Sequence, residues 1–496
     1  MRVQRSRRSL LCAATALALI PSAPTRAQPA IEGVWSAYGP RFRDANSAPR
    51  RRIRSGRPRA TDGLREWHAI ALECTGLDHT PPATDEARVF GEQLGPGRSS
   101  RAMAIVHIAI FDALNAMARR YRGYLEMDAP IGRASAESAV AQAAHDTLVA
   151  LYPSQRADLD EALMQDLALV RDPSARARGI DLGQRAAAAI LADRANDGSN
   201  HREPRIGVDY FPGGGPGQWR PDPISQSPIA LGARWAEVKP FVLRAADQFR
   251  TPRPPALDSA AYATAYEEVK RLGGDGSQTP TVRSEQQSQI GIYWAYDGMP
   301  SLCAPPRLYN QIALQIAETR TPRPLELARL LALVNIAMAD AGIAIWESKY
   351  FYSFWRPVTG IREAQPASLI ADLGFVPLGA PASNLTGPNF TPPFPAYPSG
   401  HAGFGAALFQ VLREIYGTDR IAFRFVSDEL NGATLDNLGH VRPRVMREFS
   451  RLSDAEEENG QSRIYLGIHW AFDKTEGIAQ GRRVARFVVN KTLTPL

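Results

Sequence analysis

Cysteine is scarce in this sequence, and its scarcity excludes two classes of site. Only three of the 496 residues are cysteines, and Cys12 lies in an N-terminal segment with the features of a removable leader. Cys74 and Cys303 remain, and two cysteines make neither a disulfide framework nor a cysteine-based zinc site. The sequence leaves open whether these two form one disulfide after export.

Long apolar runs and basic runs with aromatic residues are also missing beyond residue 27. A membrane-spanning helix needs about 18 or more apolar residues in succession, and no stretch of the remaining chain approaches this. We therefore expect a soluble chain with no membrane span. The one basic run, "RFRDANSAPRRRIRSGRPR" at 41–59, is more typical of a flexible or surface-laid arm than of a nucleic-acid site. The sequence thus predicts no nucleic-acid partner, and it leaves the oligomeric state undetermined.

Residues 1–27 supply most of the basic balance of the chain. They combine an arginine-rich start, the apolar run "LLCAATALALIPSA" and the small-residue exit "TRAQ", which is typical of a secretory signal peptide cut near Ala27. The five arginines of this leader account for most of the formal net charge of +7. We predict export to the periplasm or the medium. "SRRSLL" also fits a twin-arginine signal, and this route stays open.

Alternating strand patterns are almost absent, whereas helical periodicity runs through most of the chain. The economical conclusion is an all-α fold of helix bundles, with two packed four-helix-type bundles and the active site in the C-terminal one. The pattern predicts helices over 99–120, 137–152, 155–171, 175–197, 258–273, 281–298, 306–320, 325–355, 400–416 and 441–473, with a break in the last left open.

One segment is too rich in glycine and proline to be helical, "DYFPGGGPGQWRPDPISQSP" at 209–228. We take it as part of the connection between two helical halves. The predicted organisation is a signal peptide (1–27), an N-terminal arm and first helix (28–98), an N-terminal helical bundle half (99–208), a Gly/Pro-rich connection (209–257) and a C-terminal helical bundle half with the active site (258–496).

Lysine is rare as well, and one lysine stands apart from the others. The chain has five lysines against 53 arginines, and Lys349 is surrounded by aromatic residues in "KYFYSFWRP". Lys349 and Arg356 are seven residues apart, which puts both on one face of a helix that Pro357 would end. Two cations on one face favour an anionic ligand. The alternative is a solvated basic face.

The stretch "PPFPAYPSGHAGFG" places Ser399, Gly400 and His401 where a proline-rich segment gives way to the helix predicted over 400–416. A helix N-terminus offers unpaired N–H groups and the positive end of the helix dipole, and glycine lets the backbone come close to a bound group. The stretch therefore fits an oxyanion site. The alternative is that Ser399 is only an N-cap and His401 only a polar first-turn residue.

Arg463, His469 and Asp473 follow one another in "SRIYLGIHWAFD". On a continuous helix Asp473 would lie on the same face as His469, four residues later. Its carboxylate would then accept a hydrogen bond from one imidazole nitrogen and leave the other as a nucleophile or metal ligand. For His469 alone, the alternative is a buried core histidine.

These three stretches together form a recognisable motif. "K-x6-RP" at 349–357, "PSGH" at 398–401 and "SR-x5-H-x3-D" at 462–473 resemble the three-part motif shared by the type-2 phosphatidic acid phosphatase superfamily and the vanadium-dependent haloperoxidases. The flanking residues resemble the vanadium chloroperoxidase branch in particular. The likeness spans most of the mature chain.

The resemblance implies a cradle for vanadate, vanadium(V), with no haem and no flavin. His469 would bond the vanadium, and His401 would be the acid–base group that handles protons as hydrogen peroxide enters. The implied partners are hydrogen peroxide, a halide ion and small organic acceptors, with hypohalous acid as the product. The oxyanion would be held by Lys349, Arg356, Ser399, Gly400 and Arg463.

Four further residues take supporting roles from the same resemblance. Trp346 and Phe394 fall where vanadium chloroperoxidases carry aromatic residues thought to line the halide site, although both also suit a plain core. Asp297 in "YWAYDG" matches an acidic residue that pairs with the cradle arginine, here Arg463, and a surface carboxylate is the alternative. Asp473 matches the phosphatase motif.

Two other functions stay open on the sequence. A phosphate ester in the same cradle would make His469 the nucleophile of a phosphohistidine mechanism and His401 the general acid, so a secreted soluble acid phosphatase is the main alternative. An exported protein that only sequesters phosphate or vanadate would need no acid–base histidine. The segment between "PSGH" and "SR" departs from the chloroperoxidases and contains His440, which has no assigned role, so the sequence does not indicate which halide or organic acceptor is preferred.

Overall fold

The computed structural model describes residues 60–82, 85–298, 301–321, 323–380, 391–434 and 440–496. The predicted signal peptide at 1–27 and the basic arm at 41–59 lie outside these residues and stay predictions. Nearly all of the regular structure in the described part is helical, and the one named sheet there has two strands. The predicted all-α class is therefore confirmed.

The elements follow the chain as two series of helices. The first comprises α2 (Ala60–Asp78), α3 (Gly95–Ala118), α4 (Ala136–Leu151), the short 3-10 helix η2 (Pro153–Gln155), α5 (Arg156–Ala168) and α6 (Pro173–Arg194). After the short η3 (Trp235–Glu237) and η4 (Ala246–Phe249) come α7 (Ala260–Leu272), α8 (Glu285–Tyr293), α9 (Pro305–Arg320), α10 (Pro324–Tyr352), α11 (Pro357–Glu363), α12 (Gly400–Tyr416), β1 (Phe423–Asn431), β2 (Arg444–Phe449), α13 (Leu452–Tyr465) and α14 (Ala471–Lys491).

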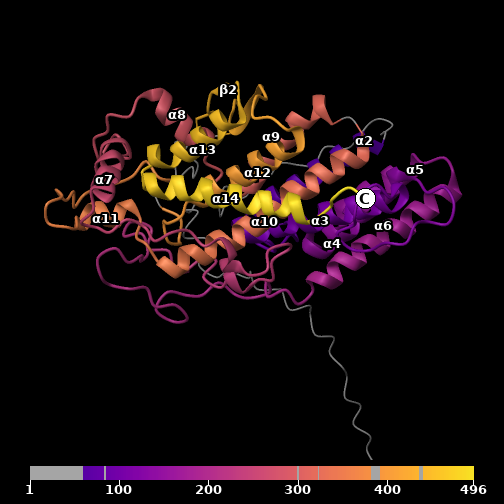
Figure 1. Cartoon of the computed structure of the whole chain (residues 1–496), viewed down its shortest axis with the longest axis horizontal. Coiled ribbons are helices and arrows are strands. Elements are labelled where there is room, and N and C mark those ends of the chain that lie inside the picture. Colours follow the sequence, from indigo (N-terminus) through magenta and orange to yellow (C-terminus); the bar gives the residue numbers. More distant parts are fainter. Residues whose placement is uncertain (1–59, 83–84, 299–300, 322, 381–390, 435–439) are drawn as a thin grey trace, which may run out of the picture.

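Helices α3 and α10 form the centre of the molecule. By length and composition both are apolar enough to cross a membrane, but 89% and 94% of their most apolar windows are buried inside the protein. The two pack against each other, and α10 also packs against α12 and α14. In Figure 1, α10 runs between the N-terminal helices, coloured indigo to magenta, and the C-terminal helices in orange and yellow. The apolar surfaces of α3 and α10 are therefore buried in the protein core.

Helices α12 and α14 approach each other closely because glycines line their contact. A Cβ at Gly481 would lie 2.1 Å from the carbonyl oxygen of Gly403, and one at Gly477 would lie 2.6 Å from that of Ser399. Only glycine fits such a contact. The close approach brings the start of α12 to the start of α14, where the Ser399 N–H donates to the carbonyl oxygen of Asp473 at 2.9 Å.

The helix predicted over 325–355 ends earlier than expected, and this corrects the placement of Arg356. Helix α10 stops at Tyr352, and Ser353 adopts a left-handed conformation with φ of 47°. Arg356 is extended and precedes α11, because a residue before proline is sterically disfavoured in the helical region. Pro357 thus begins a new helix. Lys349 and Arg356 do not share a helix face.

The helix predicted over 441–473 is confirmed over α13 and the first residues of α14, with the break that the sequence left open between them, and is wrong at its start. Residues 444–449 form strand β2, which pairs antiparallel with β1 and stacks Phe449 on Phe423 with ring centroids 5.1 Å apart. Helix α13 then ends at Tyr465, because Gly467 turns the chain with φ of 73°. His469 lies in the connection before α14, so it shares no continuous helix with Arg463.

Three smaller expectations are settled or left as they were. Cys74 and Cys303, both described, are buried thiols that form no disulfide. His440 is exposed at the edge of the hairpin segment. Residues 209–257, all described, contain no α-helix beyond the 3-10 turns η3 and η4. Their use as a domain boundary stays a prediction.

Candidate active site

The start of α12 is built around the Ser399–Gly400–His401 tripeptide. Ser399 is the N-cap, and its hydroxyl accepts from the Ala402 N–H at 3.4 Å. A Cβ at Gly400 would come within 3.3 Å of the Trp346 ring, so a glycine suits the tight approach between this turn and the aromatic wall. The capping role and an oxyanion role are compatible, because an N-cap satisfies only part of the unpaired N–H groups of the first turn.

Lys349 reaches this turn from the last part of α10 and is completely buried. Its ammonium group donates to the carbonyl oxygens of Pro395 at 2.8 Å and Ala396 at 2.9 Å. Those two bonds use two of its three N–H donors. Burial lowers the pKa of Lys349 well below its ordinary value, and the nearby Arg356 lowers it further. A bound anion would oppose both effects and favour the charged ammonium.

Two buried arginines complete the cationic side of the site. The Arg356 guanidinium donates to the carbonyl oxygens of Phe394 at 3.0 Å and Ile468 at 2.8 Å, and its Nη2 has no partner in the described structure. Arg463 donates through one Nη to the Asp297 carboxylate at 2.6 Å, while its Nε and other Nη lack a partner in the same sense. Buried N–H groups of this kind are costly unless a ligand accepts from them.

His469 is oriented from both sides of its ring. Its Nδ1 lies 2.8 Å from the Asp473 carboxylate, and its Nε2 lies 3.0 Å from an Arg356 Nη. This pattern assigns the proton to Nδ1 and leaves the Nε2 lone pair directed at the cationic side chains. Burial lowers the pKa of His469 well below 6.5, helped by Arg356 and Lys349, so the ring is neutral at neutral pH. The contact predicted between His469 and Asp473 is confirmed, although a helix start rather than a continuous helix provides it.

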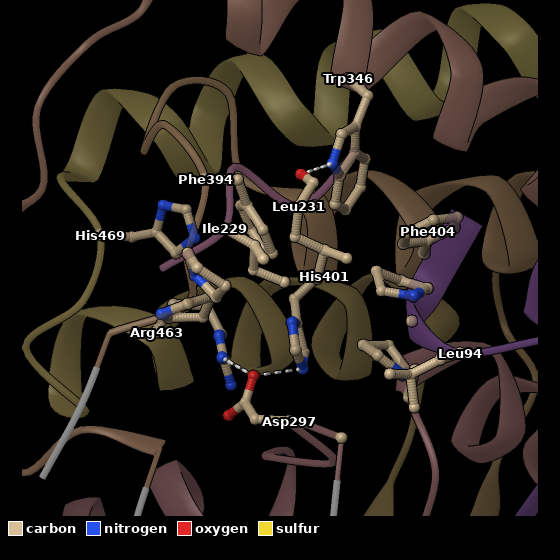
Figure 2. A pocket seen from close by; sticks show the side chains of 18 residues that line it. Leu94, Ile229, Leu231, Asp297, Trp346, Phe394, His401, Phe404, Arg463 and His469 are labelled. Carbon is tan, nitrogen blue, oxygen red and sulfur yellow. Dashed lines mark hydrogen bonds and ion pairs between the residues drawn. The ribbon is translucent and has the colours of Figure 1, made fainter. Parts of the chain in front are cut away.

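His401 faces a short loop after α8. Its Nε2 lies 2.5 Å from the carbonyl oxygen of Ala295 and 3.8 Å from the Asp297 carboxylate. The carbonyl contact requires a proton on Nε2, which leaves Nδ1 as the acceptor. Burial lowers the pKa of His401 well below 6.5, and Arg463 adds to the effect. Figure 2 shows His401 and Arg463 converging on Asp297.

An apolar wall covers the other side of the site. Trp346 and Phe394 pack with ring centroids 4.9 Å apart, and the Lys349 ammonium lies 5.1 Å from the Phe394 ring centre. The Trp346 indole N–H donates to the carbonyl oxygen of Leu231 at 3.1 Å. Together they border a pocket of about 740 Å³ that includes its open mouth, lined by the histidines and Arg463 on one side and mostly apolar residues on the other (Figure 2).

The charges of the site fit an oxyanion. Lys349, Arg356 and Arg463 outnumber the carboxylates Asp297 and Asp473, and burial raises the pKa of Asp473 to about 7, so that group is only partly ionised near neutral pH. Burial also raises the pKa of Asp297, against the lowering effect of Arg463. Within the described residues no cluster of three or more histidine, cysteine or acidic side chains could hold a bare metal cation. Unpaired guanidinium N–H groups in a cationic pocket match the oxygens of phosphate or vanadate.

The structure thus brings all the predicted site residues into one region, although from separate segments of the chain. The sequence did not reveal the backbone carbonyls that orient them: those of Ala295, Leu231, Phe394 and Ile468. A carbonyl is present at every residue, so no residue type marks its use. The loop positions become evident only from the fold.

The comparisons with known proteins agree with this arrangement. A family model for the second helical-bundle domain of vanadium chloroperoxidase matches residues 329–495. Vanadium chloroperoxidase of Curvularia inaequalis is 33% identical over 487 aligned residues, which cover 82% of this chain and 78% of that protein. The chain belongs to the vanadium-dependent haloperoxidase family.

Solved structures similar to this member of the vanadium haloperoxidase family support its fold. A bacterial vanadium-dependent iodoperoxidase superposes with a TM-score of 0.68 at 24% identity, covering 90% of this chain and 99% of that one. An apo-type bacterial vanadium-dependent chloroperoxidase gives 0.62 at 18% identity, covering 80% and 94%. At these identities the likeness speaks for the helical architecture alone. The family membership rests on the sequence relative.

Proposed function

We propose that this chain oxidises a halide ion with hydrogen peroxide to hypohalous acid, using vanadate held at the start of α12. The observation that carries the proposal is the set of unpaired guanidinium N–H groups of Arg356 and Arg463 beside the oriented His469 ring. A vanadium chloroperoxidase that is 33% identical supports it. The proposed reaction is halide plus hydrogen peroxide plus a proton, giving hypohalous acid and water.

The residues present fit vanadate by chemistry and charge. Lys349, Arg356 and Arg463 would hold its oxygens together with the Ser399 hydroxyl and the Gly400 N–H. The Nε2 lone pair of His469, which faces an Arg356 Nη at 3.0 Å, would bind the vanadium. When bound, vanadate would supply a Lewis acid that makes hydrogen peroxide electrophilic towards halide. The protein's own contribution is a cationic site of buried side chains, in which such charge effects are strong.

His401 is the proposed acid–base group. Because its Nε2–H donates to the Ala295 carbonyl oxygen, Nδ1 is the atom that accepts a proton from incoming hydrogen peroxide and returns it as water leaves. Its depressed pKa keeps the ring neutral and therefore ready to accept. Asp297, 3.8 Å from Nε2, would stabilise the transient imidazolium.

Trp346 and Phe394 are the proposed neighbours of the halide. Their rings lie against Lys349, and the wall continues through apolar residues towards the pocket mouth. A weakly hydrated anion would be accommodated there next to a cation, and small organic acceptors would meet the apolar lining.

A phosphatase remains the second proposal, and one observation favours it. His469 has a neutral Nε2 lone pair, with Nδ1–H held by Asp473, which is also the state required of a nucleophile that forms phosphohistidine. In that reaction His401 would donate a proton to the leaving alcohol. The leader predicted at 1–27 makes either enzyme an exported one in our proposal.

The deciding experiment is halogenation of a phenolic dye by the purified apo-protein with hydrogen peroxide and bromide, before and after orthovanadate is added. Hydrolysis of p-nitrophenyl phosphate is measured in parallel. We expect bromination that depends on vanadate, and repetition with chloride and iodide then ranks the halides. If vanadate gives no bromination and only inhibits rapid ester hydrolysis, the phosphatase proposal replaces the first.

A further inference from the structure

The outer contacts of His401 and Arg463 both come from one short loop. In residues 294–298, Ala295 provides the carbonyl oxygen that accepts from His401, and Asp297 provides the carboxylate that pairs with Arg463. Tyr296, between them, has a φ of 43°. A non-glycine residue in such a conformation is strained and persists only when its surroundings hold it.

Strand β1 supplies what holds this loop. The Tyr296 N–H donates to Oε1 of Glu429 at 2.8 Å, and the Tyr296 hydroxyl accepts from the Asp428 N–H at 2.8 Å. Nearer the start of the strand, the Ser427 hydroxyl donates to the carbonyl oxygen of Tyr293, at the end of α8, at 2.6 Å. Strand β1 therefore binds both the backbone and the side chain of Tyr296.

Glu429 is the unusual member of this contact. It is fully buried, and its second carboxylate oxygen accepts from Arg442 at 2.6 Å, across the hairpin segment. Burial raises its pKa to about 7 against the lowering effect of Arg442. Glu429 does not line the pocket, so direct contact with a bound oxyanion does not explain a buried carboxylate there. Its hydrogen bond from the Tyr296 N–H, between Ala295 and Asp297, does explain it.

We propose that Glu429 is a positioning residue, which holds the Tyr296 turn so that Ala295 and Asp297 meet His401 and Arg463. The inference rests on the proposed function, since it assigns the hairpin a role in setting the acid–base histidine. The segment that departs from the chloroperoxidase pattern would thus be an orienting part of the active site. A carboxylate at this place acts through the loop and touches no reacting atom.

The test compares Glu429→Ala and Ser427→Ala with a matched control, Glu456→Ala. Glu456 is equally buried and pairs with Arg413 and Arg482, away from the loop. The vanadate-loaded full-length variants are assayed for bromide oxidation across a range of pH. In Glu429→Ala we expect kcat to fall about 10- to 100-fold, with a smaller loss of orthovanadate affinity and a shifted pH profile. Ser427→Ala should change the same three quantities less, and the control should leave all three unchanged.

A second readout does not depend on halide turnover. In apo-protein labelled with 15N-histidine, the His401 Nε2–H signal, assigned with His401→Gln, should shift or exchange faster with solvent in Glu429→Ala. If Glu429→Ala does not fold, Ser427→Ala carries both measurements. A folded Glu429→Ala or Ser427→Ala protein with wild-type kcat, pH profile and His401 signal overturns the inference. If even the wild type brominates nothing, the proposed function has failed, and the His401 signal still decides the positioning role.

Discussion

Asp473 allows the orientation of His469 to be tested separately from the charge of the site. Its Oδ2 accepts from the His469 Nδ1–H at 2.8 Å and from the Trp470 N–H at 3.0 Å. Asp473→Ala removes this acceptor and leaves a buried N–H of the imidazole without a partner. Asp473→Asn keeps an acceptor oxygen of the same reach but removes the charge. The two variants therefore separate hydrogen bonding from electrostatics.

The two effects have opposite signs for oxyanion binding. Without the hydrogen bond, the His469 ring is no longer fixed in one tautomer and one orientation. Loss of such a contact to a ligand-binding histidine typically weakens ligand affinity about 10- to 100-fold. Loss of the carboxylate charge makes the site more cationic and favours an anion. This gain is limited, because a pKa of about 7 leaves Asp473 only partly ionised near neutral pH before the anion binds. Orientation should therefore dominate.

The assay is calorimetric titration of the apo-variants with orthovanadate near neutral pH, repeated with inorganic phosphate. We expect Asp473→Ala to bind both about 10- to 100-fold more weakly than wild type, and Asp473→Asn to stay much closer to wild type. Glu476→Ala removes a carboxylate from the same helix and is the matched control. Wild-type affinity in a folded Asp473→Ala protein would refute the orienting role of Asp473, and tighter binding in both variants would show that charge decides.

The remaining predictions test the acid–base role of His401, the halide contact of Phe394, the buried histidine His68 and the close contact between α12 and α14. His401→Ala should still bind orthovanadate in a titration but lose about 100- to 10,000-fold in bromide oxidation, and an undiminished rate would exclude the acid–base role. Phe394→His should change the chloride-to-bromide rate ratio, and an unchanged ratio would argue against a halide contact. His68, buried beside His107, has a pKa lowered to about 4 by burial, so folding favours its neutral form. The stability that this gives the protein is fully present above the pKa of unfolded histidine, near 6.5, and is lost as the pH falls towards 4. Urea unfolding should therefore show wild type losing about 3 kcal/mol more than His68→Gln between about pH 7 and pH 4. Gly481→Ala should lower the free energy of unfolding by about 1–3 kcal/mol and weaken orthovanadate binding, because its Cβ would press on Gly403.

The fold class was predictable because helical periodicity is a local property. Helix α12 begins and ends where its sequence indicates, since Ser399 caps it and Gly417 ends it in a left-handed conformation. The errors came where a tertiary contact overrides the local pattern. Residues 444–449 were predicted as part of a helix but pair with β1, an earlier segment of the chain, instead. Pairing between distant segments cannot be read from one of them.

The site was predictable as a set of residues but not as a geometry. Lys349, His401 and His469 belong to motifs whose spacing along the chain is visible, and the fold does bring them together. The route differs from the expected one: Arg356 reaches the site from a turn before α11, and His469 from a connection before α14. The breaks in the helices therefore set where these two side chains lie.

The contacts that orient these residues explain why the breaks matter. Arg356 and His401 are fixed by carbonyl oxygens, and such oxygens are available only where the backbone leaves regular helix and its C=O groups are not used within the helix. A site that must hold several buried cations in fixed positions therefore needs irregular backbone around it, here the 294–298 loop, the 353–356 turn and the 466–470 connection. The irregular backbone in turn needs outside support, which Glu429 provides for the first of these. The hairpin that helical periodicity failed to predict is thus, in our proposal, part of what holds the active site in place.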